Sequence, residues 1–448
     1  MTKNRYGQLT QKMFIMKLSN MKLANIINLK SIYLLTSLHC IFLIIFCGRQ
    51  WYSDTASYIV AWDVISKFEI DMWRTPVYPI FLGILKTIFG NDDYLFYGTI
   101  IQHFIFLISI YYFHQLSKGI IKSYNISICT TAFYALYPCV STWNCYMITE
   151  PLAIYGTIFM LYCALKAFQN NSIIHIIFYA FWTVFLIFLR PALIYILPVF
   201  FIGWILIYFK NQRMTKAVWG GFCTILLSST MMLLYCQCYY NKFNLFSPSG
   251  IGVINKYYIA RLNGYLKPEN TKNAELKIFL ENTINIHGQK YSGGTDHDLY
   301  METEEAIYTY GLKEISNLVS TANKTDYHSF LRGFSQRVHK ASNDKLFETL
   351  LHKWKNITDI FGVKLKIVYW LLIIFPIIIL YWIYKKKSIP CFSIILYMLG
   401  WSHLFLILYA CQNVWDRLIL PIIPVYLIMF GQLFNTVKLK YNNEFEYI

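Results

Sequence analysis

Charged residues are scarce in this sequence: Asp, Glu, Lys and Arg together make up 14% of its 448 residues. Soluble globular domains carry about 25%. Hydrophobic residues reach 56%, and the mean hydropathy is +0.42. This balance excludes a soluble enzyme, a disordered tail and a collagen-like fibre. A polytopic integral membrane protein remains, with the lipid bilayer as its first partner.

Acidic residues are fewer than basic ones, 23 against 40, which leaves a net charge of +17. A nucleic-acid-binding protein presents its basic residues on a polar surface. Here the basic residues interrupt long apolar runs, as they do in the cytoplasmic loops of membrane proteins. We therefore expect no nucleic-acid partner.

Two more absences limit the function. Residues 240–363 contain no cysteine, so this long stretch is not a disulfide scaffold. The sequences GxxxxGK[ST], HExxH and GxSxG do not occur in the chain. ATP hydrolysis, zinc proteolysis and esterase chemistry of those kinds are therefore unsupported.

About 20 mostly apolar residues are needed to cross the hydrocarbon core of a bilayer. Ten runs approach this length, at 31–48, 94–117, 123–141, 150–168, 172–189, 191–209, 217–239, 364–384, 389–410 and 418–436. The apolar run 77–90 is shorter, and we expect it to form an interfacial or re-entrant helix. The predicted fold is an all-α polytopic membrane protein of about ten transmembrane helices.

The short loops carry their basic residues asymmetrically. With the N-terminus inside, the inner segments hold 17 Lys and Arg residues against 6 on the short outer loops. Because cytoplasmic loops are enriched in Lys and Arg, this bias predicts the orientation. The six on the outer side are Arg49, Lys67, Arg74, Lys86, Arg190 and Arg417.

The pattern divides the chain into three parts. Residues 1–239 hold seven spans and a first outer loop at 49–93, residues 240–363 form an extracytoplasmic segment, and residues 364–448 hold three spans and a short cytoplasmic tail. In the middle part, apolar residues near helical spacing predict helices at 274–286, 304–319 and 330–357. We expect a mainly helical soluble domain there.

Ionisable residues at a membrane boundary are costly and mark candidate functional sites. Under the predicted topology, several of them gather near the outer surface although they come from distant parts of the chain. They are Asp54, Asp63, Glu69, Asp71, Arg74, Glu150, Arg190, Asp416 and Arg417. Their convergence predicts one site. By contrast, His403 lies within an apolar run and is more typical of packing.

The first outer loop favours a helix from Asp54 to about Trp73. At 100° per residue, Tyr58 shares the face of Asp54, while Asp63 lies on the opposite side. The alternative role for Asp54 is a helix N-cap. Arg74 comes just before Pro76 and Pro79, which suit the start of a new helix.

An arginine at a helix N-terminus makes a good phosphate site, because the guanidinium and the helix dipole act together. The alternative role for Arg74 is an arginine that reaches the lipid headgroups from the interface.

SDTASY at 53–58 and RTPVYPIFLGILKTIFG at 74–90 together resemble the glycosyltransferase-C superfamily, the membrane enzymes that use sugars on polyprenyl phosphates. Bacterial protein mannosyltransferases and lipid A aminoarabinose transferases are the members that it resembles most. ITEPL at 148–152, LRPALIYILP at 189–198 and DRLILPIIP at 416–424 are similar to later elements of that superfamily. The resemblance is best over 31–239, whose seven spans match the size of the shared membrane module.

The resemblance implies an inverting transfer of a sugar from a polyprenyl-phosphate carrier to a glycan, lipid or protein acceptor, at the outer face of a bacterial cytoplasmic membrane. Asp54 would be the general base, and Arg74 and Arg417 would bind the donor phosphate. Tyr58, Asp63, Tyr78, Glu150, Arg190 and Asp416 would support the site or contact the sugar. Many members have a second acidic residue after the first-loop aspartate. Thr55 stands there in this chain, so a divalent metal is possible but unsupported, and no other cofactor is expected.

Two other classes of function remain open. A polymerase or ligase of surface polysaccharide would carry its key arginines on a long outer loop, whereas here the first loop is richer in charge. A flippase or transporter of lipid-linked sugars would need paired broken helices in two related halves, with charge at mid-membrane. The predicted spans are almost free of charge at their centres.

Overall fold

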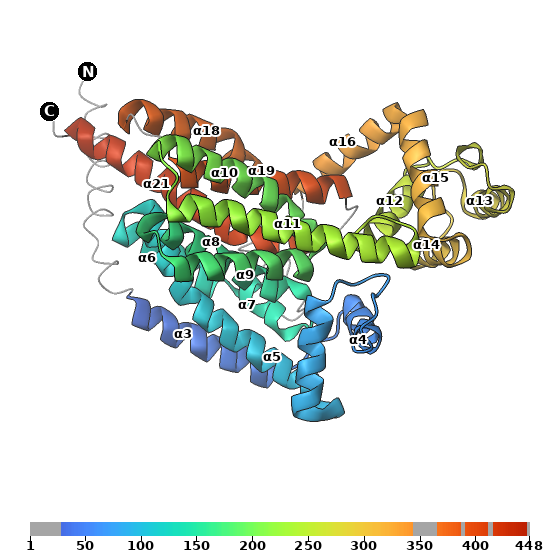
Figure 1. Ribbon diagram of the computed structural model, residues 1–448, viewed down its shortest axis with the longest axis horizontal. Coiled ribbons are helices and arrows are strands. Elements are labelled where there is room, and N and C mark those ends of the chain that lie inside the picture. Colours follow the sequence, from blue (N-terminus) through green and yellow to red (C-terminus); the bar gives the residue numbers. More distant parts are fainter. Residues whose placement is uncertain (1–27, 344–364, 387–389, 411–414, 446–448) are drawn as a thin grey trace, which may run out of the picture.

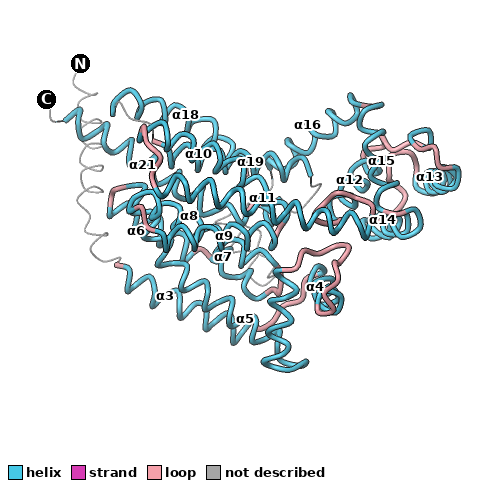
Figure 2. The backbone as a smooth tube through the Cα atoms, viewed as in Figure 1, coloured by secondary structure: helices cyan, strands magenta, loops and turns pink. Residues whose placement is uncertain are grey.

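The computed structural model describes residues 28–343, 365–386, 390–410 and 415–445. This part of the chain is almost entirely helical and contains no β-strand, as predicted. A helix bundle makes up one end of the molecule, and a smaller group of helices extends from it (Figures 1 and 2). We call the end of the bundle nearest to this smaller group the domain end.

Eight helices within the described residues are long and apolar enough to cross a membrane. They are α3 (Leu29–Phe42) with the π-helical turn η1 (Leu43–Cys47), α5 (Val77–Ile121), α8 (Thr149–Asn170), α10 (Ile196–Asn211) with the 3-10 turn η3 (Pro191–Tyr195), α11 (Lys216–Phe243), α18 (Lys366–Lys386), α19 (Cys391–Ala410), and α21 (Ile423–Phe445) with the 3-10 turn η6 (Leu420–Ile422). The chain thus has the helices of an integral membrane protein.

The two remaining predicted spans are shorter in the structure. The segment 123–141 forms α6 (Tyr124–Leu136) and α7 (Pro138–Ser141), and the 3-10 turn η2 (Thr142–Cys145) follows it. The segment 172–189 forms the apolar helix α9 (Ile173–Leu189), which has 17 residues. Both α6 and α9 pack within the bundle, against α5 and α8 respectively. The total of ten spans therefore stays a prediction.

α5 consists of two helices that meet at Gly90. The backbone of Gly90 has φ 78° and ψ 175°, a conformation that residues with a Cβ avoid. The chain bends there, and the segment before Gly90 turns away from the long second part (Figure 1). This break agrees with the prediction that 77–90 forms a helix distinct from the following span.

α8 lies at the centre of the bundle, between α5 and α9. Nearly all of its residues are buried, and they belong to the main hydrophobic core. Gly156 allows α9 to approach closely, because a Cβ at this position would lie only 2.9 Å from Leu186. The first turn of α8 is therefore firmly held at the domain end.

A second hydrophobic core forms the smaller helical group. It joins α12 (Ile251–Leu262), α13 (Ala274–His287), α14 (Asp296–Tyr310) and α15 (Leu312–Thr325) to the end of α11. The 3-10 turn η4 (Pro268–Asn270) packs against α13 and α15. α16 (Tyr327–Asn343) then leads back to α18 and α19. The helix predicted at 274–286 is present, but the one predicted at 304–319 is two helices, because Gly311 has a φ of 84°. Of the predicted helix 330–357, residues 344–357 lie outside the described part.

A buried ion pair holds this second core together. The Arg261 side chain is fully buried and its Nε lies 2.9 Å from Oε1 of Glu302. The same guanidinium donates to the carbonyls of Gly288 at 2.7 Å and Thr283 at 3.0 Å. Because its charge and its donors are satisfied internally, we assign Arg261 a structural role.

Candidate functional site

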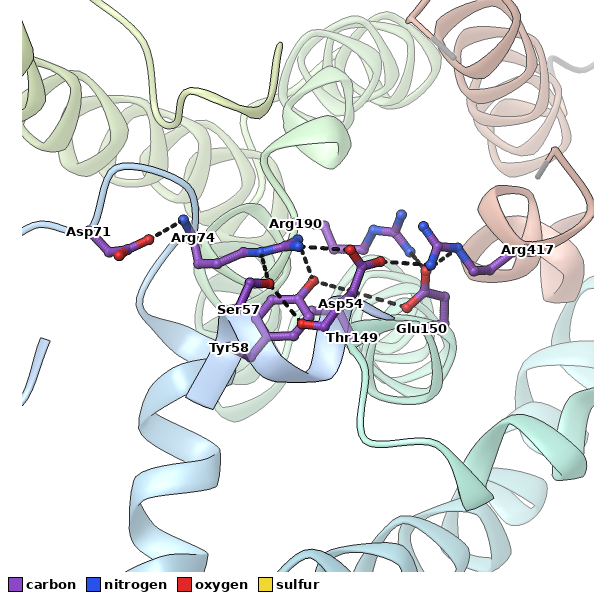
Figure 3. A network of polar contacts seen from close by, with 9 residues as sticks. All are labelled: Asp54, Ser57, Tyr58, Asp71, Arg74, Thr149, Glu150, Arg190 and Arg417. Atoms are coloured by element: carbon purple, nitrogen blue, oxygen red, sulfur yellow. Dashed lines mark hydrogen bonds and ion pairs between the residues drawn. The ribbon is translucent and has the colours of Figure 1, made fainter. Parts of the chain in front are cut away.

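Five charged side chains from five separate segments meet at the domain end (Figure 3). They are Asp54 in the first turn of α4 (Ser53–Ile65), Arg74 just before α5, Glu150 in the first turn of α8, Arg190 at the C-cap of α9, and Arg417 in α20 (Trp415–Leu418). These segments lie far apart in the sequence, and the packing of the bundle brings them together.

Asp54 is bound on both of its carboxylate oxygens. Arg74 Nη2 donates to Oδ1 at 2.8 Å, and Arg417 Nη1 donates to Oδ2 at 2.7 Å. The alternative role as an N-cap is wrong, because Tyr52 occupies the N-cap and no side chain caps this helix. The Asp54 carboxylate is thus engaged by two arginines, while its side chain stays 27% exposed.

Glu150 lies beneath Asp54 and is almost completely buried. Its Oε1 lies 3.2 Å from Nη1 of Arg190 and 3.2 Å from Nε of Arg417. The other oxygen, Oε2, accepts a hydrogen bond from Thr149 at 3.2 Å. Arg417 therefore links the two carboxylates, and the five charges form one continuous network.

Arg74 is held by α4 as well as by Asp54. Its Nε donates to Ser57 at 2.8 Å and its Nη1 donates to the Tyr58 hydroxyl at 3.1 Å. The guanidinium lies 4.2 Å from the centre of the Tyr58 ring. Asp71 accepts from the backbone N–H of Arg74 at 2.6 Å and fixes the turn that leads into it.

The predicted helix from Asp54 to Trp73 is wrong in length, because α4 ends at Ile65. Phe68 then adopts a left-handed conformation with φ 61°, and the chain turns back. This reversal is what brings Arg74 next to Ser57 and Tyr58. A continuous helix would have carried Arg74 about 30 Å away from Asp54, at 1.5 Å per residue.

The other predicted site residues have different positions. Tyr78 is fully buried, and its ring packs on that of Tyr58 with 4.8 Å between centroids. Asp63 is exposed on α4, and the network does not include it, so its predicted role at the site is corrected: it lies nine positions after Asp54, which places it on the opposite helix face. Asp416 belongs to α20, and its side chain lies outside the described part.

Three residues of the site were not predicted, and Asp71 was predicted only as one of the charges near the outer surface. Ser57 and Thr149 bind the network through their hydroxyls, and Asp71 shapes the turn before Arg74. The Tyr52 ring lies 4.7 Å from the Arg417 guanidinium. Two signals were available in the sequence: Ser57 follows Asp54 by almost one helical turn, and an aspartate three residues before Arg74 favours a turn.

The network carries more positive than negative charge. Three arginines against two carboxylates leave +1 (3 − 2) at the domain end. Burial raises the pKa of Asp54, but the charges of Arg417 and Arg74 outweigh this effect and lower the pKa to about 2. Asp54 is therefore ionised at neutral pH, and the site as a whole attracts an anion.

Within the described residues, no group of three or more His, Cys, Asp or Glu side chains is arranged to hold a metal ion. In comparisons with known proteins, neither a family model nor a curated protein matches the chain. The interpretation of the site therefore depends on its own geometry and on the sequence motifs.

Proposed function

We propose that this protein is a membrane glycosyltransferase that moves a sugar from a polyprenyl-phosphate carrier to an acceptor. The observation that carries the proposal is the Asp54 carboxylate held between Arg74 and Arg417, at 2.8 and 2.7 Å, in a network with one excess positive charge. A base, a phosphate-binding pair of arginines and a bundle of apolar helices are what such a transfer needs.

The charges suit the substrate and the product. A sugar on a polyprenyl phosphate is a phosphodiester with one negative charge, and the released polyprenyl phosphate gains a second. Arginines arranged before the reaction stabilise the charge that develops on the leaving phosphate. The planar guanidinium groups of Arg74 and Arg417 also match phosphate oxygens in pairs. The apolar helices give the lipid tail a place within the bilayer.

The residues of the site account for each bond and each proton in the transfer. An acceptor hydroxyl or amine attacks the anomeric carbon, its proton passes to Asp54, and the bond between the anomeric carbon and the phosphate oxygen breaks. The phosphate keeps the electron pair and is held by the arginines. Attack opposite the leaving phosphate inverts the anomeric centre. A well-placed base typically contributes about 10²–10⁴-fold.

Asp54 is a weak base while both arginines bind it, because its pKa is then about 2. A donor phosphate would compete with the carboxylate for the same two guanidinium groups. As these groups turn toward the phosphate, the pKa of Asp54 rises. Donor binding would therefore activate the base, and the ion pairs would prevent Asp54 from taking a proton without a donor.

We further propose that the domain end faces the outside of a bacterial cytoplasmic membrane, where the acceptor is a glycan, a lipid or a protein. The bias of basic residues toward the opposite loops supports this orientation. A polysaccharide polymerase with key arginines on its long outer segment is less well supported, since two of the three arginines of that segment, Arg261 and Arg337, are buried. A flippase is less well supported too, because the charges gather at helix ends.

Deletion of the gene tests the proposal directly. The polyprenyl-linked sugar that serves as donor should accumulate in the deletion strain, and mass spectrometry of extracted lipids would identify it. The purified protein in nanodiscs should then release polyprenyl phosphate from that lipid when acceptor-containing membranes are added. An unchanged lipid profile, together with no binding of undecaprenyl phosphate by the purified protein, would contradict the proposal.

A further inference from the structure

His403 makes two hydrogen bonds inside the bundle. It belongs to α19 and is only 2% exposed. Its Nδ1 lies 2.9 Å from the Tyr195 hydroxyl, and its Nε2 lies 2.8 Å from the carbonyl oxygen of Leu418. A histidine in an apolar run is more typical of a packing residue with satisfied hydrogen bonds than of a ligand, and here both ring nitrogens have specific partners.

The two partners adjoin two arginines of the site. Tyr195 closes η3, the short turn that begins directly after Arg190, and Leu418 follows Arg417. Arg190 and Arg417 both lie 3.2 Å from Oε1 of Glu150. Their segments are therefore joined twice, once through the guanidinium groups at Glu150 and once through His403.

The partners also define the tautomer of the neutral ring. A carbonyl oxygen can only accept, so Nε2 carries the hydrogen that it donates to Leu418. In the neutral ring Nδ1 is then an acceptor, and the Tyr195 hydroxyl donates to it. The neutral imidazole therefore satisfies every donor and acceptor in this link. A hydrophobic ring of similar size would fill the space but would leave the hydroxyl and the carbonyl without these bonds.

We infer that His403 and Tyr195 are positioning residues: they set the spacing between Arg190 and Arg417, which meet at Glu150, and so orient Arg417 for the donor phosphate. The inference rests on the proposed function. Neither residue touches the phosphate, and both act through the backbone segments that carry the arginines. Small displacements of groups that orient a substrate are costly, so loss of this link should weaken donor binding more than folding.

Tyr195→Phe is the mildest test, because it removes one hydroxyl and keeps the ring. The full-length protein in nanodiscs would be titrated with undecaprenyl phosphate, and its melting temperature measured. Loss of one hydrogen bond predicts about 2–10-fold weaker binding. Tyr426→Phe is the matched control: the Tyr426 hydroxyl donates to the Gly400 carbonyl at 2.8 Å, also against α19. It should leave the affinity unchanged.

His403 can be dissected with two substitutions. His403→Gln keeps a donor near the position of Nε2, and His403→Asn keeps an acceptor near that of Nδ1. Each should retain part of the affinity, whereas His403→Phe should lose more than either one. In transfer assays these losses should appear in the KM for the donor while kcat changes little. A merely structural role would lower the melting temperature and reduce the amount of active protein, without raising the KM for the donor.

Double-mutant cycles decide through which arginine Tyr195 acts. In an Arg190→Ala background, Tyr195→Phe should cost no further affinity for undecaprenyl phosphate. In an Arg74→Ala background it should cost the full factor, because Arg74 is held by α4 and not by η3. Equal binding by wild type and Tyr195→Phe, or full additivity with Arg190→Ala, would overturn the positioning role and leave the proposed function intact. No binding by the wild type would overturn both.

Discussion

Arg417 donates to Oδ2 of Asp54 at 2.7 Å although 363 positions separate them in the chain. Through this bond the last part of the sequence completes a site that begins in the first loop. The same arginine lies 3.2 Å from Glu150. Arg417 therefore joins its own segment to those of Asp54 and Glu150. A truncated chain that lacks α20 and α21 would therefore lack half of the clamp on Asp54.

Arg74→Ala should weaken binding of undecaprenyl phosphate much more than Arg74→Lys. Loss of a charged hydrogen-bonding partner costs about 1.5–3 kcal/mol, or roughly 10–150-fold in affinity. Lysine keeps the charge but not the two-pronged geometry. Titration of the purified variants in nanodiscs would measure this difference. Equal affinity in wild type and Arg74→Ala would reduce Arg74 to an interfacial anchor.

Glu150→Gln should destabilise the folded protein. The glutamate side chain is 3% exposed and neutralises Arg190 and Arg417 at once. The variant leaves two nearly buried guanidinium groups without this counter-charge, which costs roughly 1–3 kcal/mol. Thermal melting in detergent would detect the loss. Glu69→Gln is the control, because that residue pairs with Lys242 at an exposed position and should leave the melting temperature nearly unchanged.

The stability of the wild type should respond to acid through Asp54. A carboxyl group whose pKa is lowered on folding stabilises the protein above its unfolded pKa, and this contribution is lost as the pH falls through the folded pKa. For Asp54 the folded pKa is about 2. The difference in melting temperature between wild type and Asp54→Asn should therefore be constant above about pH 5 and shrink between about pH 4 and 2. A difference independent of pH would show that the ion pairs contribute little.

The orientation can be tested with cysteines. Ser53 is exposed at the domain end, and Arg213 is exposed between α10 and α11 at the opposite end. In a background where the exposed Cys129, Cys223 and Cys238 are replaced by serine, a membrane-impermeant reagent should label Ser53→Cys in intact cells. Arg213→Cys should react only after the membrane is opened. The reverse pattern would overturn the proposed outer location of the site.

The sequence predicts the helices and the candidate charges well, because both depend on local composition. Apolar runs define the long helices, and the asymmetry of basic residues predicts that the charged residues gather on one side. The early end of α4 could not be predicted, since residues 54–73 contain no proline or glycine. Contacts with distant residues end it: the Met72 carbonyl accepts from Tyr239 at 2.7 Å and from the Gly250 N–H at 2.8 Å. The link from His403 to Tyr195 spans 208 positions and has no local signal either.

Asp54→Asn distinguishes the role of Asp54 as a base from its role as an ion-pair partner. Asparagine keeps the size of the side chain but takes up no proton at neutral pH, so transfer should fall by about 10²–10⁴-fold. Binding of undecaprenyl phosphate should stay equal or become tighter, because Arg74 and Arg417 no longer have a competing carboxylate. Asp63→Asn, on the opposite face of α4 and exposed, is the matched control and should retain transfer. If Asp54→Asn loses phosphate binding as well, the role of Asp54 is to hold the two arginines in place; if transfer survives, the base must be another group.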